Sequence, residues 1–183
     1  DTVGIGLTPT FMDRQAGYAK AIAAIDKALA TIAANPMSSA ILANLPPGIE
    51  IPNTLLALKA RYLTFSGSHA AAFTAANAVN LAVKSELRYD NNTTTGNPIA
   101  VVSTTSNNVF QVKDSTMGLP IALRPTVNDK RVGFYMVINT AAAPRWRING
   151  FGAALGTLWP VYLPSEVTLM KAESYARAND LPN

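Results

Sequence analysis

The sequence of 183 residues contains no cysteine and only one histidine, His69. Without thiols the chain can form no disulfide bond and no thiolate metal site, and one imidazole is too few for an ordinary zinc site. We therefore expect no metal and no other cofactor. His69 stands at the start of a predicted helix, where packing or surface exposure is the ordinary role of such a residue.

Enzyme motifs are missing as well. The sequence contains no Gly-x-Ser-x-Gly elbow, no Ser-x-x-Lys pair and no phosphate-binding Gly-x-x-x-x-Gly-Lys loop. The glycine-rich stretch from Gly150 to Gly156 misses the dinucleotide fingerprint by one residue and is read as a loop. The carboxylates are scattered, and no motif places two of them across a sugar cleft as a glycosidase requires. We predict a protein that is not an enzyme.

Charge is also sparse, because only 14% of the residues are charged while 49% are apolar. Such a chain can bury a sizeable core, and no apolar run reaches the roughly 20 residues needed to span a bilayer. The net charge is +4, and five cations fall in one stretch: Arg124, Lys130, Arg131, Arg145 and Arg147. A nucleic-acid surface usually carries a denser basic stripe, so we expect no nucleic-acid partner.

Three helices are predicted in the first part of the chain, residues 1–87. The first spans Pro9 to Ala34, with Thr10 and Asp13 as a cap pair and Asn35-Pro36 as its end. Its buried stripe is Tyr18, Ile22, Ile25, Leu29 and Ile32. After a proline-containing connector, Asn53 is expected to cap a helix over 54–66 that ends at Gly67, and Ser68 to cap a third helix to Leu87. The alanines of this third helix predict a tight antiparallel hairpin with the second.

An irregular excursion follows over residues 88–163. Three short strands are predicted in it, at Ile99–Val102, Asn108–Val112 and Arg131–Ile138, with proline and glycine between them. Long segments of this kind are often functional. The last helix is predicted to begin at Pro164, with Ser165 as its cap.

Two helices share a spacing that is typical of tetratricopeptide hairpins. Lys59-Ala60 is followed by Leu63 and Gly67, and Lys171-Ala172 is followed by Tyr175 and Asn179 at the same intervals. A second helix follows Gly67, but no helix follows Asn179. We therefore expect 164–183 to be the first helix of a further hairpin, the domain to be incomplete, and the Leu169, Ala172, Tyr175 stripe to be partly uncovered. An ordinary terminal helix is the alternative.

Three stretches resemble the SusD/RagB family of nutrient-binding outer-membrane lipoproteins. They are "ALKARYLTFSGSHAAAFTAANAV" (57–79), "NDKRVGFYMV" (128–137) and "WPVYLPSEVTLMKAESYARANDLPN" (159–183). The most recognisable positions of the last stretch are Glu166, Met170, Ala172 and Glu173. Pro164-Ser165 departs from the family's Arg-Leu. The resemblance covers the middle of a family member, without its lipid-bearing cysteine, first helical hairpin and C-terminal segment.

The resemblance implies a mainly α fold, a SusD-like α-α superhelix of tetratricopeptide-like hairpins interrupted by the irregular excursion. It implies a lipid-anchored protein on the outer face of the outer membrane of a Gram-negative bacterium. Members of the family capture oligosaccharides, or in some branches peptides, and pass them to a TonB-dependent transporter of the SusC type. They usually bind their ligands through the irregular region and loops.

Sugar recognition needs an aromatic ring to stack on a pyranose and polar side chains to reach its hydroxyl groups. The stretch "PRWRING" has this composition, so Trp146 is the predicted stacking residue, with Arg145, Arg147 and Asn149 as hydrogen-bonding neighbours. Core packing under the loop is the alternative role of Trp146, and it is the expected role of Trp159 and Tyr135. A tetratricopeptide-like scaffold that docks a protein and binds no small ligand is the alternative function.

Overall fold

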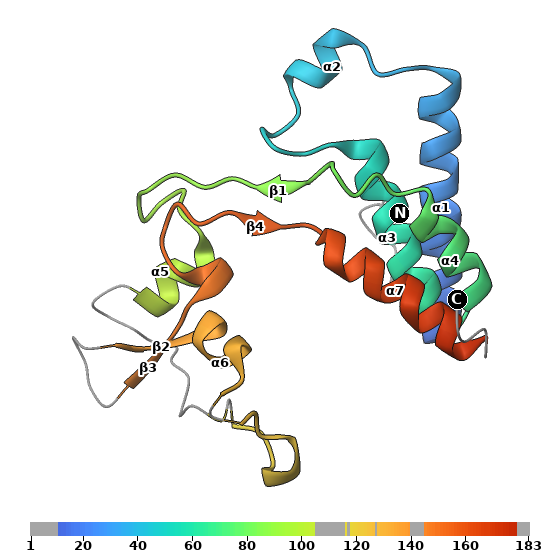
Figure 1. Ribbon diagram of the computed structural model, residues 1–183. Coiled ribbons are helices and arrows are strands. Elements are labelled where there is room, and N and C mark those ends of the chain that lie inside the picture. Colours follow the sequence, from blue (N-terminus) through green and yellow to red (C-terminus); the bar gives the residue numbers. More distant parts are fainter. Residues whose placement is uncertain (1–10, 105–115, 117, 127, 140–144, 179–183) are drawn as a thin grey trace. The chain divides into compact units, whose positions relative to one another are not determined.

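The computed structural model describes residues 11–104, 116, 118–126, 128–139 and 145–178 (Figure 1). These residues are mainly helical, which confirms the predicted fold class at that level. The chain divides into two compact units. The helical unit comprises Asp1–Leu45, Glu50–Ser85 and Tyr162–Asn183, and the irregular unit comprises Pro46–Ile49 and Glu86–Val161.

The first helix, α1 (Arg14–Ala34), begins at a carboxylate cap. Asp13 accepts hydrogen bonds from the backbone N–H groups of Gln15 and Ala16 at 2.8 and 3.0 Å, so the helix starts one residue later. The predicted start at Pro9 and the cap residue Thr10 lie outside the described residues. Of the predicted stripe, Ile25 is buried and the other members are half-buried. A short helix that the sequence analysis missed, α2 (Ser39–Ala43), follows and is capped by Ser38.

Helix α3 (Ile51–Phe65) begins three residues before the predicted start, so the predicted cap is wrong. Glu50 is the cap, and Pro52 fits the first turn because no helical hydrogen bond needs its missing N–H. Asn53 is instead buried, where its amide donates to the Asn80 carbonyl and to the Tyr162 hydroxyl. At the other end Gly67 has a φ of +82°, which confirms the left-handed stop.

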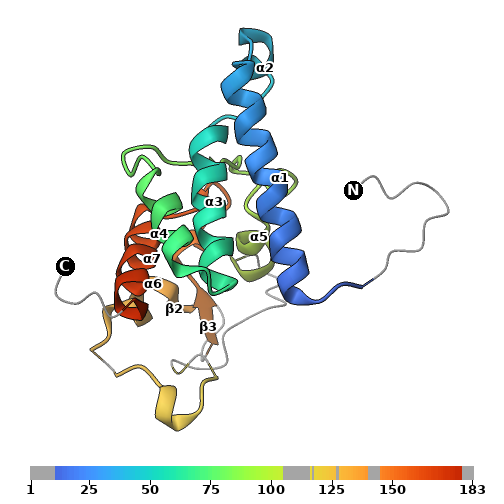
Figure 2. The same cartoon turned by 90° about the vertical axis from the view of Figure 1, so that its right-hand side faces the viewer.

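Helix α4 (His69–Asn77) packs against α3 in the helical unit (Figure 2). Ala60 and Ala72 were predicted to lie where these helices meet, and both are fully buried. The helix ends ten residues before the predicted Leu87. The reason is Asn53, whose side chain accepts from the backbone N–H of Asn80 and donates to its carbonyl, so both groups are withdrawn from a helical ladder. The predicted cap Ser68 makes no side-chain cap hydrogen bond.

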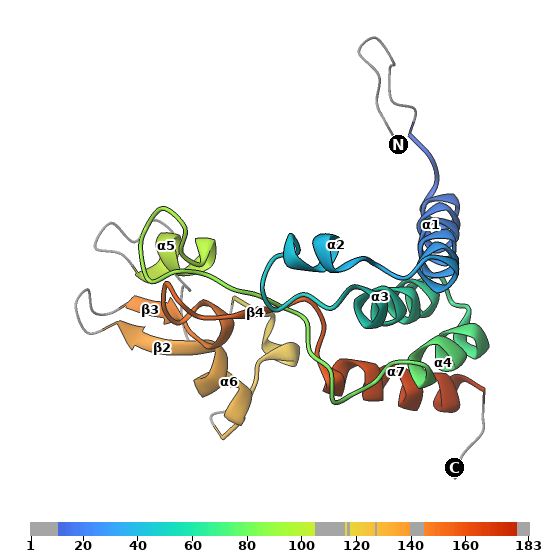
Figure 3. The same ribbon diagram turned by 90° about the horizontal axis from the view of Figure 1, so that it is seen from above.

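Helix α7 (Pro164–Arg177) begins at Pro164 as predicted and lies alongside α4 (Figure 3). The cap is Leu163 rather than Ser165, and its backbone N–H donates to the Glu166 carboxylate at 3.4 Å. The helix buries its Val167, Met170 and Ser174 face. The predicted stripe is not fully covered, because the Leu169 side chain is 69% exposed.

Two of the resembling stretches are joined by an ion pair between α3 and α7. Arg61 donates from Nε and Nη2 to the two carboxylate oxygens of Glu166, at 2.5 and 2.7 Å. Both side chains are half-buried, and the hydrogen bond to Glu166 raises the pKa of Arg61. A second ion pair, between Lys59 and Asp26, connects α3 with α1. Two ion pairs of the helical unit therefore connect one helix with another.

The described residues of the irregular unit form two short antiparallel ribbons. β1 (Glu86–Leu87) pairs with β4 (Trp159–Pro160), and β2 (Met136–Asn139) pairs with β3 (Arg145–Ile148). Its helical segments are α5 (Pro98–Thr104), η1 (Ile121–Leu123), α6 (Lys130–Tyr135) and η3 (Gly150–Gly152).

Two of the predicted strands are wrong in whole or in part. Residues 99–102 lie in α5, because the buried Asn97 accepts from the N–H groups of Ile99 and Ala100 and so starts a helix despite the β-branched run. Residues 131–138 form α6 and then β2, because the Asp129 side chain caps a helix there. The predicted strand at Asn108–Val112 lies outside the described residues.

Candidate functional site

The predicted sugar-binding residues lie on β3 and just after it. In the β2–β3 ribbon Trp146 pairs with Ile138 and Arg147 pairs with Val137. Because successive side chains of a strand point to opposite faces, Arg147 lies on the other face from Trp146. The side chain of Arg145 lies outside the described residues. The ribbon therefore does not bring Arg147 beside the indole ring.

Trp146 shares its face of the ribbon with core residues. Directly paired residues lie on one face, so this face also carries Met136, which is 3% exposed, and Ile148. Ile148 lies close to Gly152. A Cβ atom added at Gly152 would lie 3.2 Å from the Ile148 side chain. This face is therefore packed at Met136 and open at Ile138, the direct partner of Trp146, which is 59% exposed, and the half-buried Trp146 lies between the two.

Asn149 holds the end of α6 in place. Its side-chain amide donates to the Gly133 carbonyl at 3.3 Å, and its backbone N–H donates to the Tyr135 carbonyl at 2.8 Å. The predicted role as a hydrogen-bonding neighbour of Trp146 would require this amide to leave its partner or to bind through its oxygen.

A row of aromatic side chains joins three elements of the irregular unit. The Phe134 ring lies 4.9 Å from that of Tyr135 and 5.5 Å from that of Phe151, both edge-on, and Phe151 lies 6.1 Å from Trp159. Phe134, Tyr135 and Trp159 are 45%, 44% and 37% exposed. More than a third of each of these residues is accessible, so the row is a candidate contact surface.

Gly150 allows the row to close. Its φ of +59° lies in the left-handed region, and a Cβ there would come within 2.9 Å of the Phe134 ring. Any other residue would therefore strain the backbone and push Phe134 away from Phe151.

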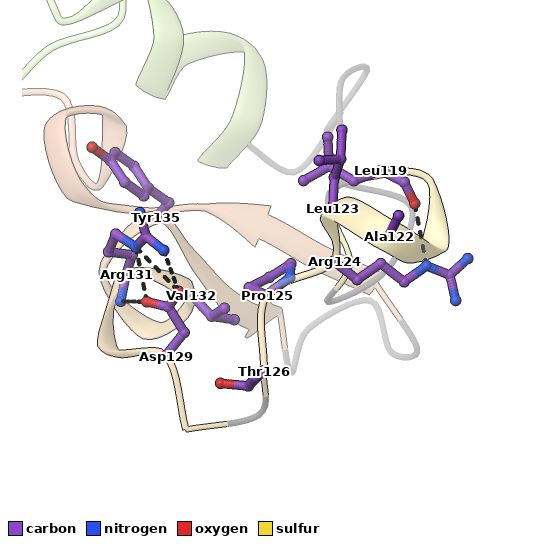
Figure 4. A pocket seen from close by; sticks show the side chains of 10 residues that line it. All are labelled: Leu119, Ala122, Leu123, Arg124, Pro125, Thr126, Asp129, Arg131, Val132 and Tyr135. Carbon is purple, nitrogen blue, oxygen red and sulfur yellow. Dashed lines mark hydrogen bonds and ion pairs between the residues drawn. The ribbon is translucent and has the colours of Figure 1, made fainter.

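Tyr135 also lines a cavity of about 460 Å³ (Figure 4). This volume falls within the range of roughly 300–1,000 Å³ of small-molecule sites. Its lining residues come from residues 119–126 around η1, from the α6 cap and from α6 itself: Leu119, Ala122, Leu123, Arg124, Pro125, Thr126, Asp129, Arg131, Val132 and Tyr135. Tyr135 belongs to both the row and the cavity, and we name the two together the Tyr135 site.

Asp129 and Arg131 form an ion pair at the Tyr135 site. Arg131 donates from Nε and Nη2 to the carboxylate, with a shortest distance of 2.6 Å, and its backbone N–H also donates to Asp129. These bonds, led by the one from the Arg131 side chain, lower the pKa of Asp129 to about 2. Asp129 is therefore ionised at neutral pH and cannot act there as a general acid.

This site was not predicted from the sequence, because two of its residues, Tyr135 and Trp159, were interpreted as core residues. Tyr135 was placed on the buried face of a strand, but the strand begins one residue later, at Met136. Trp159 was read in the same way. The signal that was present is the glycine on each side of Phe151, which predicts a ring brought close to other backbone.

No metal site is found, because no three His, Asp or Glu side chains of the described part gather where they could hold an ion. None of the described helices combines the length and the apolar character needed to cross a membrane. The chain gives no match to any protein-family model, to any curated protein or to any solved structure. The case for a function therefore rests on the residues themselves and on the resemblance described above.

Proposed function

We propose that the chain is a non-catalytic binding protein for oligosaccharides, with the Tyr135 site as the place where the sugar binds. The observation that carries the proposal is the exposed row of Phe134, Tyr135 and Trp159, of which Tyr135 also lines a cavity with charged and hydroxyl side chains. Aromatic faces stack on the apolar faces of pyranoses, and the polar groups reach their hydroxyls.

The residues of the site have different roles in this proposal. Tyr135 and Phe134 offer ring surface, and Trp159 extends it toward a second sugar unit. Thr126 and Arg131 are hydrogen-bonding residues that line the cavity. A further contact region remains a prediction, and binding at the Tyr135 site does not depend on it. Its residues are Trp146, Arg145, Arg147 and Asn149.

The resemblance to SusD/RagB proteins extends the proposal beyond the site. On that basis the protein is lipid-anchored at the outer face of the outer membrane and passes its ligand to a SusC-type TonB-dependent transporter. The helical unit is the scaffold in this proposal, because two ion pairs connect its helices and the alanines of its core are buried: Ala57, Ala60, Ala72, Ala75 and Ala76. The tetratricopeptide-like arrangement of its hairpins belongs to the same proposal.

A protein-interaction scaffold is the second candidate. The observation that favours it is Leu169, whose 69% exposed side chain lies on α7 away from the buried face of that helix. Exposed leucine on a helix surface is compatible with docking of another protein. In this case the aromatic row would not bind sugar.

An array of neutral and acidic oligosaccharides separates the two candidates. We expect the wild-type chain to bind at least one class of glycan and Tyr135→Leu to weaken that binding about tenfold, as loss of a stacking contact predicts. The matched control is Phe65→Leu, which removes an exposed ring from the helical unit and should leave binding unchanged. Absence of binding to every glycan would contradict the proposal and favour the scaffold.

A further inference from the structure

The surplus positive charge of the chain falls in the stretch of sequence that contains Arg131 and Tyr135. Between Arg124 and Arg147 the sequence contains five cations and one carboxylate, Asp129, an excess of 5 − 1 = +4. The whole chain has 15 cations and 11 carboxylates, also an excess of +4. The remaining residues are therefore neutral in sum, and the surplus charge belongs to this stretch.

Within this stretch the single carboxylate is already neutralised. Asp129 is largely covered by its partner, with 16% of its side chain exposed, while the Arg131 side chain is 81% exposed. Arg131 donates hydrogen bonds to Asp129 from Nε and Nη2. Its Nη1 donates no hydrogen bond to any described residue. Arg131 therefore still offers N–H donors to a ligand.

The second arginine of the cavity contributes charge rather than a direct contact. Arg124 donates from Nε to the Leu119 carbonyl at 3.2 Å, and Figure 4 shows its guanidinium group directed away from Asp129 and Arg131. With two guanidinium groups and one carboxylate among its lining residues, the cavity carries a net positive charge. A cavity with this balance attracts anions.

Arg131 and Tyr135 lie four residues apart on α6. Residues at this spacing share one face of a helix, with their Cβ atoms roughly 5–6 Å apart. A ligand whose ring rests on Tyr135 can thus place a group attached directly to that ring near Arg131. A planar guanidinium group recognises carboxylates especially well.

We propose that the Tyr135 site selects carboxylate-bearing sugars, with a uronate ring on Tyr135 and its carboxylate at Arg131. This inference rests on the proposed function and specifies its ligand class. Asp129 then limits the affinity, because it competes with the ligand carboxylate for Arg131.

Calorimetric titration with matched acidic and neutral ligands tests the inference. The probes are tetragalacturonate and tetramannuronate, each beside its methyl ester, which keeps the rings and removes the charge. We expect at least one acid to bind about tenfold more tightly than its ester, since hydrogen bonds to charged groups are the stronger ones. Equal affinity for acid and ester would overturn the inference and leave glycan binding intact. Binding of neither acid would also overturn it, while binding to neutral glycans on the array would still support the proposed function.

Two substitutions of opposite expected effect sharpen the test. Arg131→Gln should lower the affinity for the acid about tenfold, to the level of the ester. Asp129→Asn keeps a side-chain oxygen to cap α6 and removes the competing charge, so affinity for the acid should rise. Lys130→Gln is the control, because Lys130 is exposed on the same helix and does not line the cavity. Removal of the Lys130 charge should change the affinity for the acid less than about twofold at physiological salt. A decrease in Asp129→Asn, or equal losses in Lys130→Gln and Arg131→Gln, would contradict the assignment.

Discussion

The two units of the molecule differ in which side chains they bury and which they expose. In the helical unit, alanines are buried between helices, and ion pairs such as Arg61–Glu166 connect one helix to another. In the irregular unit, large aromatic rings remain half exposed, and Arg131 extends into solvent beside them. Buried alanines and ion pairs that connect helices favour a rigid unit. A unit that exposes rings and positive charge is built for contact with something else.

The largest effect is expected from disturbing the alanine contact of the helical unit. Ala60 is fully buried between helices, so Ala60→Leu should lower the free energy of unfolding by about 1–3 kcal/mol through overpacking. Thermal unfolding measures the loss. Ala70→Leu is the matched control, because Ala70 is exposed on α4 and should change stability little. Equal melting temperatures for the wild type and Ala60→Leu would contradict the close packing of α3 and α4.

The ion pairs of the helical unit should differ among themselves. Glu166→Gln breaks the half-buried bidentate pair with Arg61, and we expect a loss of about 1–2 kcal/mol. Glu173→Gln breaks the exposed pair with Arg177 on one helix, worth about 0.3–0.5 kcal/mol. Chemical denaturation of the two variants compares them directly. A loss in Glu173→Gln as large as that in Glu166→Gln would remove the distinction between bridging and local pairs.

A smaller effect is expected from the buried tyrosine of the helical unit. Burial raises the pKa of Tyr162, whose hydroxyl donates to the Val83 carbonyl at 2.7 Å. Because the folded pKa lies above the ordinary value of 10, the contribution to stability is full below pH 10 and is lost as pH rises through the folded pKa. Denaturation between pH 8 and 11 should show this decline, and Tyr162→Phe should not. The same decline in both proteins would assign it to another group.

Periodicity and composition predicted the helical unit better than the irregular one. The stripe around Ile25, the glycine stop at Gly67 and the start at Pro164 are local signals, and each appears where expected. Two of the errors involve buried asparagines. Asn53 binds the backbone of Asn80, 27 residues away, so the early end of α4 cannot be read from neighbouring residues. Asn97 caps α5 locally, but its amide also donates to carbonyls 54 and 60 residues away.

The predicted site shows the same limit. The composition of "PRWRING" correctly marks aromatic and cationic residues in the irregular region, but strand alternation separates Trp146 from Arg147. The Tyr135 site is assembled from α6, η3 and β4, and only the fold brings Phe134, Phe151 and Trp159 together. A site made of distant segments has no local motif from which to predict it.

The smallest effect concerns the carboxylate of the irregular unit. The pKa of Asp129 is lowered to about 2, so its interaction with Arg131 is fully present above about pH 4 and is lost as pH falls toward 2. An NMR titration of the carboxyl carbon should show a midpoint near 2 in the wild type. In Arg131→Gln the midpoint should move up toward the ordinary value. A wild-type midpoint near the ordinary value would show that the pair does not persist in solution.

The most direct test of the division between the two units is hydrogen–deuterium exchange of the whole chain, with and without the tightest-binding oligosaccharide from the array. We expect the backbone amides of residues 118–139 and 150–160, around the Tyr135 site, to exchange more slowly when the ligand is added. We expect no change in the exchange of amides in α3, α4 and α7. Protection confined to α3, α4 and α7, with none around Tyr135, would contradict the assignment of ligand binding to the irregular unit.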